Sequence, residues 1–174
     1  MIHNLAQEDV PVLYFFFRQI VDANHRPINL VRDWLDQILE YCPPLQVTLS
    51  NYVDQSRPLD SISIDELWRL LKTALESIPR ICCVVDALDE MDDGNSDFIT
   101  RLADLGCWRP LSVKVLLTSR PTANVEAAMR GAKFLDVRME EKLVDVDIST
   151  YVRYCLADSS LSESDQQLVK EAVP

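Results

Sequence analysis

The chain has 174 residues, of which 48% are hydrophobic, and this suits one domain with a sizeable core. Only three residues are glycine, and Gly94, Gly106 and Gly131 are too far apart to form a glycine-rich phosphate-binding loop. The formal charge is −11, which opposes binding to nucleic acid or to an anionic membrane surface.

Short apolar runs alternate along the chain with segments of helical periodicity, and this alternation predicts a layered α/β fold with a parallel sheet. The first run, Val12–Phe17, is apolar throughout, which predicts a strand covered on both of its faces. Four runs in all are expected to be strands: residues 12–17, 81–85, 113–117 and 134–137.

Helices are expected between these strands. The first carries an apolar stripe from Leu30 to Leu39 and ends before Pro43, after which we expect a loop of about twenty residues. The segment Ser63–Glu66 forms a capping box that begins a second helix, which closes before Pro79. Further helices are expected at the apolar stripes of residues 98–105, 125–129 and 148–156, and the polar tail 158–174 predicts the start of one more.

The sequence gives no sign of secretion or of membrane insertion. No apolar run reaches the roughly 18–20 residues needed to span a bilayer, and no Lys or Arg precedes the first hydrophobic segment. We therefore expect a soluble, cytoplasmic protein. Its five cysteines have no zinc-type spacing, and we expect small buried apolar side chains rather than a metal or redox site.

Acidic residues follow the second predicted strand directly. In an open parallel sheet, ligands bind at the carboxyl ends of the strands, so Asp86 is a candidate ligand for Mg²⁺. Asp89 and Glu90 lie within one turn of it and are candidates to orient an attacking water. A solvated acidic turn explains the same residues equally well.

Polar residues also follow the third predicted strand, where Thr118, Ser119 and Arg120 come after Val113–Leu117. The planar guanidinium of Arg120 can bind a phosphate, with Ser119 beside it as a further candidate ligand. The alternative is a simple strand end at which the arginine pairs with a surface acid.

Taken together, these segments resemble the NACHT group of signal-transduction P-loop NTPases, of the nephrocystin-like N-terminal type. Val84–Glu90 is similar to their extended Walker B motif, a hydrophobic strand followed by D-x-x-D-E. Leu116–Pro121 resembles their sensor-1 strand, Val12–Phe17 their aromatic second strand, and Asp147–Val152 the segment after the last core strand.

The resemblance covers residues 1–157 and implies a partial nucleotide-binding core, with residues 158–174 starting a following helical segment. The implied fold is α/β, a three-layer P-loop NTPase-like parallel sheet that is incomplete because the Walker A strand is absent. In the family that strand lies between the sensor-1 strand and the last core strand. Its absence would leave a vacancy there or force those two strands to pair directly, and an exposed edge of that kind favours aggregation or self-association. The chain is therefore expected to be a fragment.

The resemblance also implies roles for the site residues. Asp86 would position Mg²⁺ through water, Glu90 and Asp89 would polarise the hydrolytic water, and Arg120 would face the γ-phosphate of ATP. The Walker A amides and lysine supply most of the grip on the phosphates. Because the sequence lacks them, we expect these residues alone to bind ATP very weakly and to show little or no ATPase activity.

The implied function is an intracellular signalling protein whose full-length form is switched by Mg·ATP. The expected partners are a nucleotide and other copies of the chain, with neither nucleic acid nor membrane. Two alternatives stay open. One is a non-catalytic interaction module that keeps the fold. The other is a Mg²⁺-dependent phosphohydrolase built on Asp86, Asp89 and Glu90, with Asp136 and Asp147 as weak further carboxylates.

Overall fold

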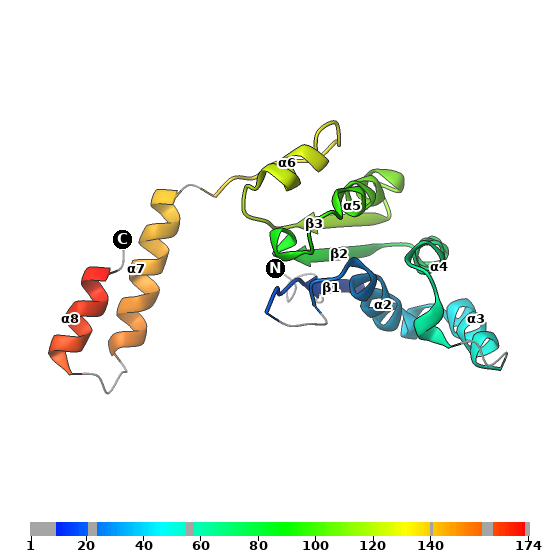
Figure 1. The fold of residues 1–174 in the computed structure, drawn as a ribbon, viewed down its shortest axis with the longest axis horizontal. Helices are drawn as coiled ribbons and strands as arrows, with labels where there is room; N and C mark the ends of the chain where they lie inside the picture. The colour runs from blue at the N-terminus through cyan, green and yellow to red at the C-terminus, as the bar shows by residue number, and fades with distance from the viewer. Residues whose placement is uncertain (1–9, 21–23, 55–57, 140, 158–161, 173–174) are drawn as a thin grey trace. The chain divides into compact units, whose positions relative to one another are not determined.

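The computed structural model describes residues 10–20, 24–54, 58–139, 141–157 and 162–172. The chain divides into two compact units, Met1–Phe134 and Leu135–Pro174. The first unit holds a three-stranded parallel sheet in the order β1-β2-β3 (Figure 1), formed by β1 (Val12–Phe16), β2 (Ile81–Asp86) and β3 (Val113–Leu117). The parallel α/β architecture predicted from the sequence is confirmed. The predicted functional boundary at residue 157 stays a prediction.

Helices occupy most of the chain between and after the strands. The connection from β1 to β2 holds α2 (Pro27–Ile38), η1 (Leu39–Tyr41), α3 (Pro43–Asp54), η2 (Leu59–Ser61) and α4 (Ile64–Glu76). The connection from β2 to β3 holds η3 (Leu88–Glu90) and α5 (Ser96–Trp108), and α6 (Ala123–Ala128) follows β3. The second unit consists of α7 (Glu141–Ala157) and α8 (Glu163–Ala172), which contact each other. Among the described helices, none has the length and apolar character needed to cross a membrane.

The capping box predicted for α4 is confirmed. Ser63 is extended, and its hydroxyl accepts a hydrogen bond of 3.3 Å from the backbone N–H of Glu66, one of the donors that a helix start leaves unpaired. At the other end, the Arg109 guanidinium donates to the carbonyls of Leu75 and Glu76 at 3.1 and 3.0 Å. Both ends of α4 are therefore capped by side chains from outside the helix, Ser63 at its start and Arg109 at its end.

The long loop predicted after residue 42 is wrong, because this segment forms α3. Pro43 and Pro44 are the first two residues of that helix. Proline is tolerated in the first turn, where its missing N–H is not needed and its fixed φ suits the helix. The two prolines therefore begin a helix as well as closing the preceding one.

The strand predicted at residues 134–137 is also wrong. Residues 132–139 have no regular secondary structure, and Phe134, Leu135 and Val137 are exposed. A strand is stabilised by the hydrogen bonds it exchanges with a neighbour. The described part of the sheet offers this segment no such neighbour, so its apolar residues do not suffice.

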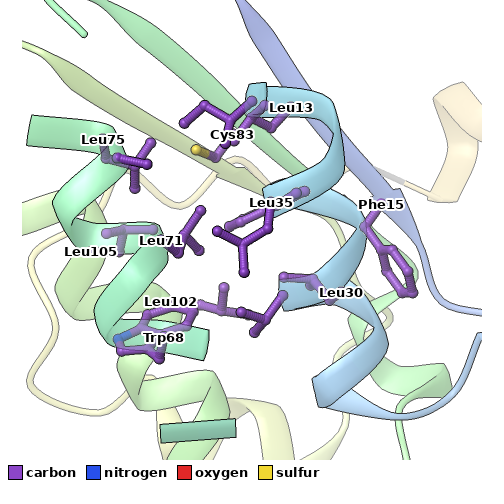
Figure 2. Packing of buried hydrophobic residues seen from close by; sticks show 14 of the residues in the cluster. Leu13, Phe15, Leu30, Leu35, Trp68, Leu71, Leu75, Cys83, Leu102 and Leu105 are labelled. Carbon is purple, nitrogen blue, oxygen red and sulfur yellow. The ribbon is translucent and has the colours of Figure 1, made fainter. Parts of the chain in front are cut away.

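The coverage predicted for the first strand is wrong as well. Leu13 and Phe15 are buried, whereas Tyr14 and Phe16 are 44% and 39% exposed. The helices α2, α4 and α5 all pack on the face that bears Leu13 and Phe15 (Figure 2). The opposite face carries Tyr14 and, across the sheet, Leu116, which is 37% exposed. The described part of the chain thus shows two of the three expected layers.

The core lies between the sheet and these helices. Figure 2 shows Leu13 and Cys83 of the sheet beside Leu35, Leu71 and Leu102 of the helices. Two pairs of aromatic rings pack edge to face within it. Their centroids are 5.0 Å apart for Phe15 and Phe17 and 5.5 Å apart for Trp68 and Phe98. This packing holds the carboxyl ends of the strands in a fixed relation.

A side chain closes the outer edge of β1. The backbone N–H of Tyr14 donates to Gln37 Oε1 at 2.9 Å, and Gln37 Nε2 donates to the Tyr14 carbonyl at 2.8 Å. The residues that flank β1 bond to β2: Phe17 donates to the Asp86 carbonyl, and the Pro11 carbonyl accepts from the N–H of Cys82. The Tyr14 groups therefore point outward, and the amide takes the place that a neighbouring strand would occupy.

We expect Gln37→Leu to lower the free energy of unfolding by about 1–2 kcal/mol, because two backbone groups lose their partner. It should also increase self-association, since an open strand edge pairs with other chains. Urea denaturation and sedimentation velocity over a range of concentrations measure the two effects. Gln46→Leu is the control, because its amide donates to the Leu39 carbonyl away from the sheet. Equal sedimentation of both variants would contradict the edge-closing role of Gln37.

Candidate functional site

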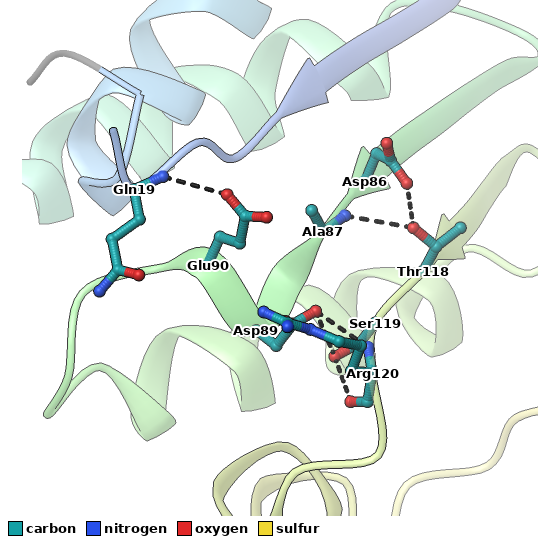
Figure 3. A network of polar contacts seen from close by, with 8 residues as sticks. All are labelled: Gln19, Asp86, Ala87, Asp89, Glu90, Thr118, Ser119 and Arg120. Carbon is teal, nitrogen blue, oxygen red and sulfur yellow. Dashed lines mark hydrogen bonds and ion pairs between the residues drawn. The ribbon is translucent and has the colours of Figure 1, made fainter. Parts of the chain in front are cut away.

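The carboxyl ends of all three strands meet at one edge of the sheet, and polar side chains gather there (Figure 3). The sequence predicted that the acids after β2 and the polar residues after β3 would meet at this edge. The structure brings together Asp86, Asp89, Glu90, Ser119 and Arg120, together with Thr118 and Gln19.

Thr118 joins the ends of β2 and β3. Its hydroxyl donates a hydrogen bond to Asp86 Oδ1 and accepts one of 3.2 Å from the backbone N–H of Ala87. Its backbone N–H donates to the Val85 carbonyl, and its carbonyl accepts from the N–H of Leu88, both at 2.9 Å. Sequence reasoning assigned Thr118 no role, although its place directly after a strand beside Asp86 was the available signal.

A left-handed residue separates the first acid from the other two. Ala87 has φ 53° and ψ 49°, and it is the one non-glycine residue with positive φ in the described ranges. This conformation is costly for a residue with a Cβ. It turns the chain from β2 directly into η3, so that Asp86 stays at the strand end while Asp89 and Glu90 take different directions.

Asp89 is bound by Arg120 through both of its oxygens. The backbone N–H of Arg120 donates to Oδ1 at 2.9 Å, and the guanidinium Nε donates to Oδ2 at 2.5 Å. The Ser119 hydroxyl lies 3.3 Å from the same Oδ1. The Asp89 side chain is 3% exposed, whereas that of Arg120 is 76% exposed. The carboxylate is therefore enclosed, and the guanidinium extends from it into solvent.

Burial raises the pKa of Asp89, but the hydrogen bonds and the charge of Arg120 outweigh it, so the pKa lies below its ordinary value. As the pH falls, the Asp89 carboxylate therefore takes up a proton more readily in the unfolded chain than in the folded one. The stability that Asp89 contributes is present above about pH 4, the usual value for an aspartate. It is lost as the pH falls through the lowered pKa of the folded state.

We expect Asp89→Asn to make the acid loss of stability shallower than in the unmodified chain, because this linked protonation is removed. Urea denaturation at a series of pH values below about 5 measures the slope. Arg120→Ala removes the donor instead of the acceptor. It should likewise make the free energy of unfolding fall less steeply as the pH is lowered. An unchanged slope in both variants would contradict the lowered pKa.

Glu90 faces the loop after β1 rather than the Arg120 side (Figure 3). Its Oε2 accepts a hydrogen bond of 3.1 Å from the backbone N–H of Gln19. Two residues further, Asp92 Oδ1 lies 3.6 Å from His25 Nε2, and the Asp92 N–H donates to the His25 carbonyl at 2.9 Å. The acidic segment after β2 thus binds the loops that follow both neighbouring strands.

The donors at this edge suit a particular kind of metal binding. No three His, Cys, Asp or Glu side chains in the described residues converge to hold a metal ion. Asp86 and Thr118 offer hard oxygen atoms, which fit Mg²⁺ held by one carboxylate, water and the phosphates of a ligand. The multi-carboxylate cluster of a phosphohydrolase is not formed in this part of the chain. Asp136 and Asp147 belong to the other unit, Leu135–Pro174.

An open groove of about 520 Å³ lies along β1 and α2 and reaches Phe16, the last residue of β1. Its lining includes Tyr14, Phe16, Arg32, Asp33 and Asp36, and none of the predicted site residues. The candidate site is therefore an exposed edge rather than an enclosed cavity.

The model of the nephrocystin 3 N-terminal family matches residues 1–120. The match spans more than half of the chain. The chain belongs to this family. The family match thus includes all three strands and ends at Arg120, the last residue of the polar network. The nephrocystin-like resemblance is confirmed, while no curated protein and no solved structure matches the chain.

Proposed function

We propose that the strand-end network of this nephrocystin 3 N-terminal chain is part of a nucleotide site in a NACHT-type P-loop NTPase core. Its cofactors would be Mg²⁺ and ATP. The observation that supports the proposal is the joining of Asp86 to Thr118 at neighbouring strand ends, with an exposed arginine at the same edge. Ligands of open parallel sheets bind at such an edge.

In this proposal Asp86, Glu90 and Arg120 each have a separate role. Asp86, fixed by Thr118, presents a carboxylate oxygen to the hydration shell of Mg²⁺, which supplies charge neutralisation when bound. Glu90 lies on the first turn after β2 and orients the attacking water. Arg120 offers its guanidinium to the terminal phosphate. In the family's switching role, a nucleotide would favour the signalling state and hydrolysis would reset it.

In this proposal the main contacts to the phosphates would have to be made by residues outside these 174, because their sequence contains no glycine-rich phosphate-binding loop. The acidic segment after β2 repels a tetra-anionic nucleotide unless Mg²⁺ bridges the two. We therefore expect weak, Mg²⁺-dependent nucleotide binding by this chain and little or no hydrolysis.

A second candidate function is a non-catalytic interaction module, and the exposed apolar face of the sheet favours it. Tyr14, Phe16 and Leu116 lie on that face and are each more than a third exposed. An exposed apolar patch on a sheet face is a common place for a protein partner to bind. The two functions differ in whether nucleotide perturbs the strand-end network.

Titration of ¹⁵N-labelled chain with Mg·ATP tests the proposal by NMR. We expect millimolar affinity, with shifts concentrated at residues 86–90 and 118–120 and abolished by Asp86→Asn. Asp97→Asn removes an exposed acid in the first turn of α5 and is the matched charge control. Shifts elsewhere, or shifts that survive Asp86→Asn, would count against the nucleotide site. Micromolar affinity would show that the phosphate grip lies within these residues.

A parallel assay separates the enzymatic alternative. Mg²⁺-dependent hydrolysis of p-nitrophenyl phosphate by the unmodified chain, lost in Asp86→Ala, would favour the phosphohydrolase over the NTPase core. We expect no such turnover, because the described residues form no cluster of three metal-binding side chains.

A further inference from the structure

The contact between Asp89 and Arg120 uses a specific part of the guanidinium. Arg120 donates from its backbone N–H and from Nε, and the two bonds end on different oxygens of one carboxylate. Among the described residues, no acceptor binds the terminal nitrogens of Arg120. The carboxylate therefore holds the backbone and Nε of Arg120 (Figure 3), and the arginine side chain as a whole is 76% exposed.

We propose that Asp89 is a positioning residue that presents the terminal nitrogens of Arg120 to a phosphate, and not a group that activates water. This inference rests on the proposed nucleotide function and deepens it. Ser119 belongs to the same clamp, because its hydroxyl lies within 3.3 Å of Asp89 Oδ1 and 2.7 Å of the Arg120 carbonyl.

In this arrangement the oxygens of Asp89 are already used, and this favours positioning over the other roles. A general base needs an oxygen that a water molecule can reach, yet both oxygens of Asp89 accept bonds and the side chain is 3% exposed. A metal ligand would have to give up the Arg120 bonds. Glu90, which lies outside this clamp, keeps the water-orienting role of the proposed site.

Positioning has a physical purpose here because arginine has a long, flexible stem. Charge-assisted bonds to the backbone and to Nε of one residue fix both the loop after β3 and the plane of the guanidinium. The two terminal nitrogens then face the same direction and match the spacing of two phosphate oxygens. Such preorganisation removes the entropy loss of ordering the side chain on binding.

Charge and positioning predict opposite effects of one substitution. Asp89→Asn removes a negative charge beside Arg120, and by electrostatics alone it would strengthen the binding of an anion. If Asp89 positions Arg120, the same substitution weakens binding, because an amide N–H₂ can replace the oxygen that Nε requires. The sign of the change therefore distinguishes the two.

The test uses sodium tripolyphosphate without Mg²⁺ as the probe and the Nε–H signal of Arg120 in ¹⁵N NMR as the readout, assigned by its loss in Arg120→Lys. In the unmodified chain we expect an ordered Nε–H that shifts on titration. Asp89→Asn should broaden this signal and weaken tripolyphosphate binding roughly fivefold or more. Arg120→Lys keeps the charge without the fork and should weaken binding similarly. Asp93→Asn is the matched control, an exposed acid whose loss should leave binding unchanged or slightly stronger.

The outcomes separate this inference from the proposed function. An Nε–H as mobile as in the urea-unfolded chain, or equal or tighter tripolyphosphate binding by Asp89→Asn, would overturn the positioning role. An ordered Nε–H that does not respond to tripolyphosphate would overturn the nucleotide function instead. If Asp89→Asn does not fold, Arg120→Lys decides, because undiminished binding by that variant contradicts a fixed guanidinium fork.

Discussion

Replacing Trp34 with alanine is expected to lower the free energy of unfolding by about 3–5 kcal/mol, the usual cost of removing a buried tryptophan. Trp34 lies on α2, is fully buried, and is among the largest buried side chains of the described chain. Its helix packs against both β1 and α4. The cavity would therefore open where the main connection between β1 and β2 meets the sheet.

The matched variant, Trp34→Phe, should be much less damaging. Within the described residues the Trp34 Nε1–H is buried and has no hydrogen-bond partner. An unsatisfied buried donor costs about 1–3 kcal/mol, so removing it offsets part of the packing lost with the smaller ring. Urea denaturation followed by circular dichroism compares the two variants. Equal destabilisation by both would show that the N–H is paired or that the indole volume is indispensable.

Ala87→Val is expected to destabilise the chain by about 2–3 kcal/mol, because a β-branched side chain is strongly disfavoured at positive φ. The residue stands between Asp86 and η3, and its N–H donates to Thr118. Relief of the strain would move that N–H and would disturb the Asp86–Thr118 contact. The loss of stability should therefore be accompanied by NMR shifts at Thr118.

Ala87→Gly should be neutral or stabilising by up to about 1 kcal/mol, since glycine adopts the left-handed conformation freely but adds freedom to the unfolded chain. Ala127→Val, at an exposed position in α6, controls for the helix propensity and bulk of valine. It should cost no more than about 0.7 kcal/mol. If valine is tolerated equally at residues 87 and 127, the left-handed turn at Ala87 is not a constraint on this site.

Several elements could be predicted from the sequence, because they depend on interactions between residues that are close together in the chain. The capping box at Ser63 and Glu66 specifies a helix start, because its hydrogen bond spans only three residues. Short apolar runs bounded by polar residues predicted all three strands of the sheet. The place of Asp86 directly after such a run predicted its position at the strand end, since parallel strands end at a common edge.

Elements that depend on distant neighbours were predicted less well. Residues 134–137 have the apolar pattern of a strand but no described strand beside them to supply hydrogen bonds. Pro43 and Pro44 are compatible with both a loop and a helix start, and the packing of α3 against α4 is not visible in the local pattern.

The sequence by itself determined the fold class, the order of the strands along the chain and the set of polar residues at their carboxyl ends. The tertiary structure alone decided which of these residues pair. It joins Asp86 to Thr118, encloses Asp89 against Arg120 and directs Glu90 to Gln19. It also decided that the face bearing Tyr14 stays uncovered in the described chain. The physical reason is that residue spacing fixes what a strand end carries, whereas side-chain partners are set by neighbouring strands that are remote in sequence.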